Sequence, residues 1–285
     1  MPTAREVQEI GRRLGSTRFR DVRWVSETGS TNADVTELIR AGEPEGITLV
    51  ADHQASGRGR RGRTWDMPER AGLLATVLLR PPARVAALTT MALALSASDA
   101  VADLCGVQSR LKWPNDLVWP GDSSAPDRKL AGILAEAEWP AGSSVASGWC
   151  PPEQSQRVGV AAGIGINVAW GTSMPAELSE TAVALDHIVS PDLVPSRPDL
   201  LVALLSRLDE HYGMLVADGG GARLLELWRG RSATLGRRVR VELGSEDVEG
   251  TAVDITSEGH LVVEDLDGTR RTLAVGDVVH LRPTS

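Results

Sequence analysis

Residues 111–119 have the sequence LKWPNDLVW, which contains two residue types that are rare in this chain. The chain has 30 lysine and arginine residues, but only Lys112 and Lys129 are lysines. Asparagine occurs at three positions, namely Asn32, Asn115 and Asn167. The apolar residues on each side of Pro-Asn-Asp predict two short strands, 111–113 and 117–119, around a tight turn. A turn explains the Pro-Asn-Asp sequence, but it gives no reason for the lysine.

The use of lysine indicates a geometric requirement. An ammonium group is a compact charge with three donors, whereas a guanidinium group is a broad planar fork. If charge alone mattered, a chain so rich in arginine would be expected to carry arginine at both positions. A lysine at a sheet edge also guards against aggregation, and this simpler explanation stays open for Lys129, which begins a predicted strand. We interpret both lysines as residues that a binding site requires.

The overall composition is that of a soluble globular protein, with 42% hydrophobic and 24% charged residues among 285. The formal net charge of −8 argues against a general nucleic-acid binder, which usually has a basic surface. The N-terminal residues are charged and lack the apolar segment of a secretion signal, so we expect a cytoplasmic protein. Cys105 and Cys150 are far apart and fit no metal or redox spacing, so we expect reduced thiols.

The first 230 residues predict a mixed α and β domain, in which residues 1–20 are a short N-terminal extension. Thr3 and Glu6 form a capping-box pattern that begins a first short helix. Residues 85–104 are the most apolar stretch, but polar and acidic residues interrupt it, so we expect a buried helix at 83–104 and no membrane span. Periodicity predicts further helices at 33–39, 196–216 and 223–228. Apolar runs predict further strands at 47–51, 73–79, 129–139 and 157–168.

The character of the sequence changes after residue 230. Apolar and polar residues alternate with a period of two, between turn residues, in four runs at 239–243, 250–255, 260–264 and 278–281. Such short alternating runs predict a small antiparallel barrel of about 50 residues. We therefore expect two domains, 1–230 and 231–285.

The strongest local signal is SGRGRRGRTW at residues 56–65. Its glycines let the backbone approach a ligand closely, and its four arginines repel one another unless an anion is present. We expect a loop that is mobile when empty and ordered around phosphate or carboxylate. Two alternatives stay open: a solvated basic loop, or an Arg-Gly segment that binds single-stranded nucleic acid with Trp65 stacked on bases.

Three further motifs carry weaker signals. RKLAGIL at 128–134 places Gly132 inside a strand, where it permits the close approach of another group. GIGIN at 163–167 leaves one strand face open, although it lacks the third glycine of a dinucleotide fingerprint, and Asn167 offers hydrogen-bond donors and acceptors. TGSTN at 28–32 is explained by an ordinary helix N-cap, but a helix start is also suited to holding a polar ligand ring.

Other chemistries lack support in the sequence. The five histidines are scattered and form no metal-ligand pattern. We find no Ser-His-Asp arrangement and no P-loop. A hydrolase of the common kinds is therefore not predicted.

GSTN, QASGRGRRGRTW, KWPNDL, RKLAGIL and GIGINV follow one another in that order along the chain. Together they closely resemble the motifs of the biotin protein ligase family, and the match extends from about residue 22 to the end. The resemblance implies an α+β fold. Residues 1–230 would form a catalytic domain whose mixed β-sheet is flanked by helices and related to class II aminoacyl-tRNA synthetases. Residues 231–285 would form the small C-terminal β-barrel.

The resemblance also implies a two-step reaction. The carboxylate of biotin would attack the α-phosphate of ATP, giving biotinyl-5′-adenylate and pyrophosphate. A lysine of a biotin carboxyl carrier domain, belonging to an acyl-CoA carboxylase, would then take the biotinyl group. ATP with Mg²⁺ and biotin would be substrates, without a tightly bound cofactor. A carboxylate and a triphosphate repel each other, so a cluster of fixed positive charges suits this chemistry.

The resemblance assigns roles to the matching residues. Lys129, Arg58 and Asp116 would be catalytic, with Lys129 on the biotin carboxylate and the α-phosphate. Asp116 would hold Mg²⁺ or orient a lysine, although no motif predicts a metal site in the protein itself. The loop after Asn167 would close over the adenylate. The full set expected to bind biotin or the adenylate is Ser30, Thr31, Asn32, Gln54, Gly57, Arg58, Gly59, Arg60, Arg61, Trp65, Lys112, Asn115, Lys129, Gly132, Gly165 and Asn167.

One departure from part of the family bears on partners. Some members carry an N-terminal DNA-binding module, whereas only about 20 residues precede the catalytic domain here, so we expect no DNA partner. We expect a monomer or a weak ligand-dependent dimer. Alternatives are a lipoate ligase of the same superfamily, a nucleic-acid-binding module, and a non-catalytic biotin sensor, against which the two lysines argue.

Overall fold

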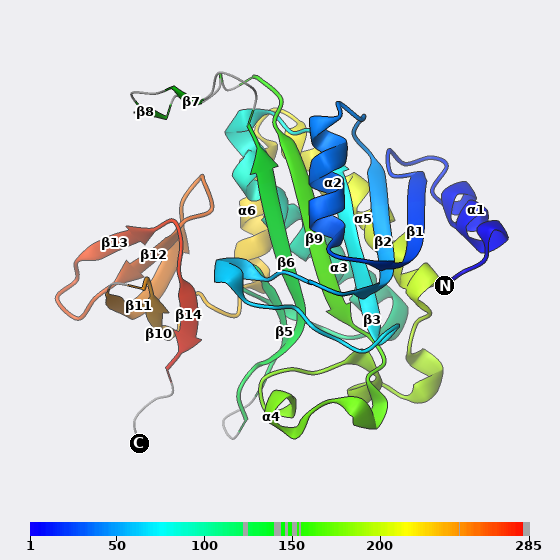
Figure 1. The fold of residues 1–285 in the computed structure, drawn as a ribbon. Coiled ribbons are helices and arrows are strands. Elements are labelled where there is room, and N and C mark those ends of the chain that lie inside the picture. The colour runs from blue at the N-terminus through cyan, green and yellow to red at the C-terminus, as the bar shows by residue number, and fades with distance from the viewer. Residues whose placement is uncertain are drawn as a thin grey trace.

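The computed structural model describes residues 1–121, 125–139, 144–145, 148–149, 153, 155–244 and 246–281. A seven-stranded sheet with helices on both faces forms the larger part, and a separate antiparallel sheet lies beside it at the C-terminal end (Figure 1). The predicted α+β organisation with a mixed main sheet is confirmed. Cys105 is a buried free thiol, whereas Cys150 lies outside the described residues. Parts of two Ser-, Gly- and Pro-rich segments, 121–128 and 140–156, also lie outside the described residues.

The strand order in the main sheet is β1-β2-β3-β9-β6-β5-β4. β1 and β2 are parallel, and every other neighbouring pair is antiparallel. The strands are β1 (Asp21–Thr28), β2 (Ile47–Gln54), β3 (Gly72–Leu79), β4 (Arg110–Lys112), β5 (Asp116–Trp119), β6 (Arg128–Glu138) and β9 (Gly159–Asn167). β7 (Ser144–Val145) and β8 (Gly148–Trp149) form a separate two-residue pair.

Burial explains which strands the sequence revealed. Every residue of β3 and β9 is buried, so these strands are continuous apolar runs and were predicted. β1 was not predicted, because it lies at the edge of the sheet and carries charged residues such as Asp21 and Arg23 among its two buried positions. Its pairing with β2 nevertheless positions the start of the next helix.

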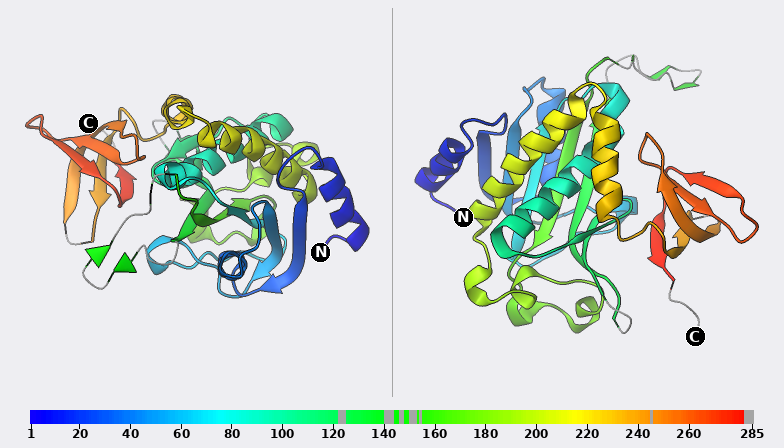
Figure 2. Two further views of the ribbon diagram at one scale, coloured as in Figure 1. Left: turned by 90° about the horizontal axis from the view of Figure 1, so that it is seen from above. Right: turned by 180° about the vertical axis from the view of Figure 1, so that it is seen from behind.

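The helices cover the main sheet unequally. α2 lies alone on one face (Figure 1), whereas α3, α5 and α6 lie together on the other (Figure 2). The α-helices are α1 (Ala4–Arg13), α2 (Thr31–Arg40), α3 (Thr89–Cys105), α4 (Ala176–Ser179), α5 (Arg197–Val216) and α6 (Gly220–Arg231). Short 3-10 helices are η1 (Arg60–Gly62), η2 (Ala83–Leu88), η3 (Gly171–Ser173), η4 (Leu185–His187) and η5 (Pro191–Leu193). The face that carries only α2 therefore has room for a site.

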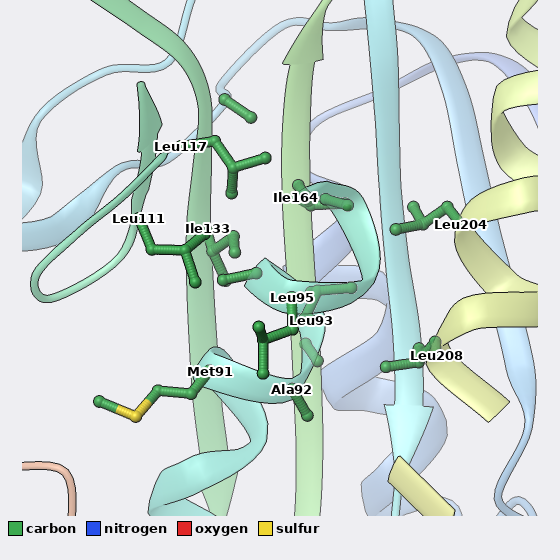
Figure 3. Packing of buried hydrophobic residues seen from close by; sticks show 14 of the residues in the cluster. Met91, Ala92, Leu93, Leu95, Leu111, Leu117, Ile133, Ile164, Leu204 and Leu208 are labelled. Atoms are coloured by element: carbon green, nitrogen blue, oxygen red, sulfur yellow. The ribbon is translucent and has the colours of Figure 1, made fainter. Parts of the chain in front are cut away.

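The predicted capping box begins α1: the Glu6 N–H donates to the Thr3 hydroxyl, and the Thr3 N–H donates to the Glu6 carboxylate. η2 and α3 together form the predicted helix at 83–104. By length and composition Ala83–Cys105 could cross a membrane, but 78% of its apolar window is buried inside the protein. Figure 3 shows Leu93 and Leu95 of α3 close to Ile133 and Ile164 of the sheet. The buried-helix prediction is confirmed.

The C-terminal sheet has the strand order β13-β12-β11-β10-β14. Its strands are β10 (Arg238–Glu242), β11 (Asp247–Ile255), β12 (Leu261–Glu264), β13 (Arg270–Leu273) and β14 (Asp277–His280). In the described part of the chain β13 does not pair with β14, so the sheet is open, and the predicted closed barrel is not observed. The charged and largely exposed β13 was also missed by the sequence, because apolar alternation is lost at this edge.

Candidate active site

A cavity of about 1680 Å³ lies on the α2 face of the main sheet and extends to the C-terminal sheet. Its walls include all the predicted site residues except Gly57 and Arg61, which line an adjoining smaller hollow. The predicted residues in the cavity wall are Ser30, Thr31, Asn32, Gln54, Arg58, Gly59, Arg60, Trp65, Lys112, Asn115, Asp116, Lys129, Gly132, Gly165 and Asn167. The motifs, which are far apart in sequence, thus meet in one place.

Glycines of β6 and β9 form the floor of the cavity. Gly132 pairs with Gly165 in the register of these two strands. A Cβ atom at Gly165 would lie 2.5 Å from the Trp65 indole, and one at Gly132 would lie 2.8 Å from it. A Cβ atom at Gly163 would lie 1.9 Å from the Asn32 amide. The open strand face inferred from GIGIN is therefore occupied by Trp65 and Asn32.

Polar groups at the start of α2 form a buried network beside this floor. The Thr31 N–H and hydroxyl both donate to Oε1 of Gln54, at 2.8 and 2.9 Å. The Thr76 hydroxyl lies 2.8 Å from both the Thr31 hydroxyl and Oδ1 of Asn32. Ser30 is the N-cap of α2, but its buried hydroxyl makes no capping bond. That hydroxyl is consequently available to a polar ligand at the cavity wall.

Glu136 connects this network to the arginine loop. One of its oxygens, Oε2, accepts from Asn32 Nδ2 at 2.8 Å and lies 3.3 Å from Arg58 Nη2. Glu136 was not predicted as a site residue, although the sequence contains a signal for it. Gly132, Leu134 and Glu136 alternate along β6, so the period of a strand places all three on the face of the cavity floor.

The arginine loop at 57–65 is folded back on itself and joined to the C-terminal sheet. The Trp65 N–H donates to the Gly57 carbonyl, and a Cβ atom at Gly57 would lie 2.1 Å from the Trp65 carbonyl oxygen. Asp277, at the start of β14, lies 3.6, 3.5 and 2.8 Å from nitrogens of Arg60, Arg61 and Arg63. The anion that this cluster needs is supplied here by a carboxylate more than 200 residues away in the sequence.

Lys129 points across the floor. Its Nζ atom lies 2.7 Å from Oδ1 of Asp116 and 5.1 Å from the centroid of the Trp65 ring. A Cβ atom at Gly132 would lie 2.9 Å from Nζ. The ammonium group therefore lies between a carboxylate, an aromatic face and a bare backbone, and this arrangement suits a compact charge.

Lys112 begins the predicted turn, which the structure forms as the hairpin β4–β5. It also lines the cavity, but it forms no ion pair or side-chain hydrogen bond with the residues that the structure describes. Burial lowers the pKa of the Lys112 ammonium below its ordinary value, although the charges of Asp116 and Asp127 act in the opposite direction. A partly buried ammonium without a counter-ion is suited to binding an anionic ligand.

The turn residues hold the hairpin in place. Asn115 exchanges hydrogen bonds with Ile133 of β6, through its backbone carbonyl at 2.9 Å and its side-chain Nδ2 at 2.6 Å. Its Oδ1 atom accepts a long bond of 3.4 Å from Arg60, whose pKa is lowered by burial. Asn115 therefore joins the hairpin, the floor and the arginine loop.

The far wall is formed by the segment after β9. Asn167 donates from Nδ2 to the carbonyls of Lys129 and Val183, at 3.3 and 3.1 Å, so its amide group joins β6 to this segment. Apolar side chains then line the cavity at Trp170, Met174 and Leu178. The structure thus gives Asn167 a structural contact in addition to its place at the cavity.

Two family descriptions match this chain: residues 26–144 match the Biotin/lipoate A/B protein ligase family, and residues 234–281 match the Biotin protein ligase C terminal domain. The chain is 36% identical to the biotin--[acetyl-CoA-carboxylase] ligase of Mycobacterium tuberculosis over 273 residues, which cover 93% of this chain and 90% of that protein. The chain belongs to the biotin protein ligase family. It is also 32% identical to the biotin--[acetyl-CoA-carboxylase] ligase of Paracoccus denitrificans, over 84% of this chain and 92% of that one.

A solved structure supports the same family assignment. The biotin protein ligase from Aquifex aeolicus in complex with biotin and ATP matches with a TM-score of 0.70 and 25% identity, over 93% of this chain and 100% of that chain. This protein and the Aquifex aeolicus enzyme therefore share their fold along nearly the whole of both chains.

No group of three or more metal-binding side chains occurs among the described residues of this biotin protein ligase. Three of the four aspartates that line the cavity are paired with cations, Asp116 with Lys129, Asp127 with Arg237 and Asp277 with the arginine loop, whereas Asp66 forms no ion pair with the described residues. Mg²⁺ commonly keeps several waters and is held by one or two carboxylates together with substrate phosphates. This donor set fits Mg²⁺ that enters with ATP and is held mainly by its phosphates.

Proposed function

We propose that this member of the biotin protein ligase family activates biotin with ATP and transfers it to a lysine of a biotin carboxyl carrier domain. In the first step a biotin carboxylate oxygen bonds to the α-phosphorus of ATP. The bond from that phosphorus to the bridging oxygen breaks, and pyrophosphate leaves. In the second step the acceptor amine gives up a proton and bonds to the acyl carbon, the bond from that carbon to the phosphate oxygen breaks, and AMP leaves. The observation that carries this proposal is the meeting of both lysines and the arginine loop over one glycine floor.

The charges at the cavity suit the first step. The carboxylate and the triphosphate repel each other, and fixed cations offset this repulsion without reorganising during the reaction. Arg58, Arg60, Lys112 and Lys129 are among the cations that line the cavity. We assign Lys129 to the reacting carboxylate and α-phosphate, with Asp116 orienting its ammonium group, and Lys112 to the outer phosphates.

The floor and the network at α2 suit the biotin ring system. A ureido ring offers N–H donors and a carbonyl acceptor, which match the Ser30 hydroxyl and the Thr31 and Gln54 groups around it. Asn32 supports this wall through its bonds to Thr76 and Glu136. The apolar segment from Trp170 to Leu178 would exclude water from the adenylate, which hydrolyses readily.

The finer assignments are part of this proposal. We take residues 1–230 as the catalytic domain, related to class II aminoacyl-tRNA synthetases, and residues 231–285 as a second domain whose open sheet is a relative of small barrels. The acceptor would be the carrier domain of an acyl-CoA carboxylase, as the names of the relatives in Mycobacterium tuberculosis and Paracoccus denitrificans suggest. We further propose a cytoplasmic protein that is a monomer or a weak ligand-dependent dimer.

Exchange of pyrophosphate into ATP tests the first step. The purified protein is incubated with ATP, Mg²⁺ and labelled pyrophosphate, with biotin in one sample and lipoate in another. We expect exchange with biotin and little above background with lipoate. Exchange that depends only on lipoate would overturn the proposal. Transfer of label from biotin to a carrier domain then tests the second step, and a non-catalytic biotin sensor would fail both.

A further inference from the structure

Three carboxylates lie close enough to Lys112 for their charges to act on its ammonium group, namely Asp116, Asp127 and Asp277. Each of them is paired with a different cation. Asp116 is bound by Lys129, and Asp277 is bound by the arginine loop. This arrangement leaves Lys112 without a counter-ion although it lies in a strongly charged region.

Asp127 is the carboxylate with the most complete set of partners. It lies one residue before β6, and its side chain is only 7% exposed. Oδ1 accepts from the Gly121 N–H at 2.9 Å. Oδ2 accepts from Arg237 Nη1 at 2.8 Å and lies 3.1 Å from His280 Nδ1. Burial alone would raise the pKa of the Asp127 carboxyl, but these partners together have the larger effect. The pKa is therefore below its ordinary value, and the carboxyl stays ionised.

Arg237 and His280 come from the C-terminal domain, at the start of β10 and the end of β14. His280 is buried against Lys112, Arg237 and Asp127, and its Nε2 atom faces the Thr234 hydroxyl at 3.4 Å. The Trp113 N–H, next to Lys112 in the chain, donates to the same hydroxyl at 3.0 Å. We assign Nδ1–H to Asp127 and an acceptor Nε2 to Thr234, because Asp127 has no proton to give.

We propose that Arg237 and His280 are positioning residues for Lys112. By binding Oδ2 of Asp127, they hold this carboxylate away from the Lys112 ammonium, which stays unpaired for the phosphates of ATP. The C-terminal sheet would in this way act on the nucleotide site through the Asp127 carboxylate. This inference rests on the proposed function only in requiring that the cavity binds ATP.

The test first removes Arg237, which competes with Lys112 for Asp127, and then removes the charge of Asp127 itself. In Arg237→Met, Asp127 loses its strongest partner and pairs with Lys112, so ATP has to displace a carboxylate. We expect the Kd for ATP, measured by calorimetry without biotin, to rise about tenfold, as expected for the loss of ~1.4 kcal/mol. Asp127→Asn in the same chain should restore the Kd to within about twofold, because the amide carries no charge.

A matched control is Arg270→Met. Arg270 is an exposed residue of β13 that pairs with Glu264 of β12, and its loss should leave the Kd for ATP unchanged. A readout without ligand comes from the lysines themselves, because the chain has only two. With ¹⁵N-labelled lysine, and Lys129→Arg for assignment, the Lys112 signal should titrate at a higher pH in Arg237→Met than in the parent.

The outcomes separate the possible causes. An unchanged Kd in Arg237→Met, or a raised Kd that Asp127→Asn does not restore, overturns the inference and leaves the proposed function intact. If the parent protein binds no ATP, the proposed function fails and the inference fails with it. Binding of ATP without biotin-dependent exchange would remove biotin from the proposal and keep the inference.

Discussion

The Lys129 ammonium group lies 2.7 Å from Oδ1 of Asp116, which is on the neighbouring strand β5. This ion pair distinguishes the two lysines, because Lys112 forms none with the described residues. An oriented cation is suited to a fixed reacting centre, whereas an unpaired one is suited to capturing a mobile anion. The two rare residues that the sequence revealed together therefore have different surroundings.

Lys129→Arg should abolish most adenylation although the charge is kept. The broader, planar guanidinium group would present its charge and its donors in a different geometry to Asp116, the Trp65 ring and the reacting oxygens. We expect biotin-dependent pyrophosphate exchange to fall by at least about a hundredfold, the size of effect seen when one preorganised charge contact is lost. Arg128→Lys, at the adjacent position, is the control for a swap between lysine and arginine, and this variant should retain pyrophosphate exchange. Near-normal activity of Lys129→Arg would refute the geometric argument.

Gly165→Ala should weaken biotin binding by at least about tenfold. The new methyl group would lie 2.5 Å from the Trp65 indole, so Trp65 has to leave the floor and lose its contact with Lys129. Calorimetric titration with biotin measures the effect. Gly230→Ala adds the same methyl group in α6 where no atom lies within 4 Å, and it should bind biotin normally. Equal affinities for the two variants would show that the floor does not carry Trp65.

Asp277→Asn should expose the arginine loop to trypsin. Without the carboxylate, Arg60, Arg61 and Arg63 repel one another, and the loop opens more often. We expect cleavage within residues 58–63 to be about tenfold faster than in the parent, and to be suppressed when biotin and ATP provide other anions. Asp267→Asn, in the exposed turn between β12 and β13, should leave the rate unchanged. A loop that is equally resistant in both variants would show that Asp277 does not hold it.

His280 should make stability depend on pH below neutrality. Burial and the charges of Lys112 and Arg237 lower the pKa of His280 from 6.5 to about 4, so the unfolded chain binds a proton more readily than the folded one. The contribution of His280 is therefore complete above pH 6.5 and is lost as the pH falls towards 4. At pH 5 the loss should be about 2 kcal/mol.

Urea unfolding at pH 7.5 and pH 5 checks this expectation, with His280→Gln as the comparison. Glutamine keeps a donor for Asp127 but does not titrate, so the variant should lose less free energy of unfolding between the two pH values. Identical losses in the parent and the variant would show that His280 does not cause the pH dependence.

The sequence predicted the floor and the cations of the cavity, because glycines in strands and clustered arginines are local signals. It also predicted the buried elements, since β3, β9 and α3 are continuous apolar segments. The partners of the cations were not predictable in the same way. Asp277 and Asp127 are ordinary acidic residues in the sequence. Only the packing of the C-terminal sheet against the main domain brings Asp277 to Arg60, and Arg237 and His280 to Asp127.

Edge strands account for the errors in the fold. β1 and β13 carry charged residues because one side of each strand faces solvent, and that charge hides the strand from a search for apolar alternation. The predicted barrel failed for a related reason. Alternating runs indicate a sheet with two faces, but they do not say whether its edge strands β13 and β14 meet.

The position of the two lysines has one more consequence. Biotinyl-5′-adenylate is an acylating agent for amines in general, and an enzyme that makes it is the protein most exposed to it. Here every lysine side chain of the chain lies inside the cavity, one bound to a carboxylate and the other partly buried. The outer surface carries its positive charge as arginine, which does not form a stable amide under these conditions. We therefore expect adenylate that leaves the cavity to find no lysine on the outer surface, so that any self-labelling is confined to Lys112 and Lys129.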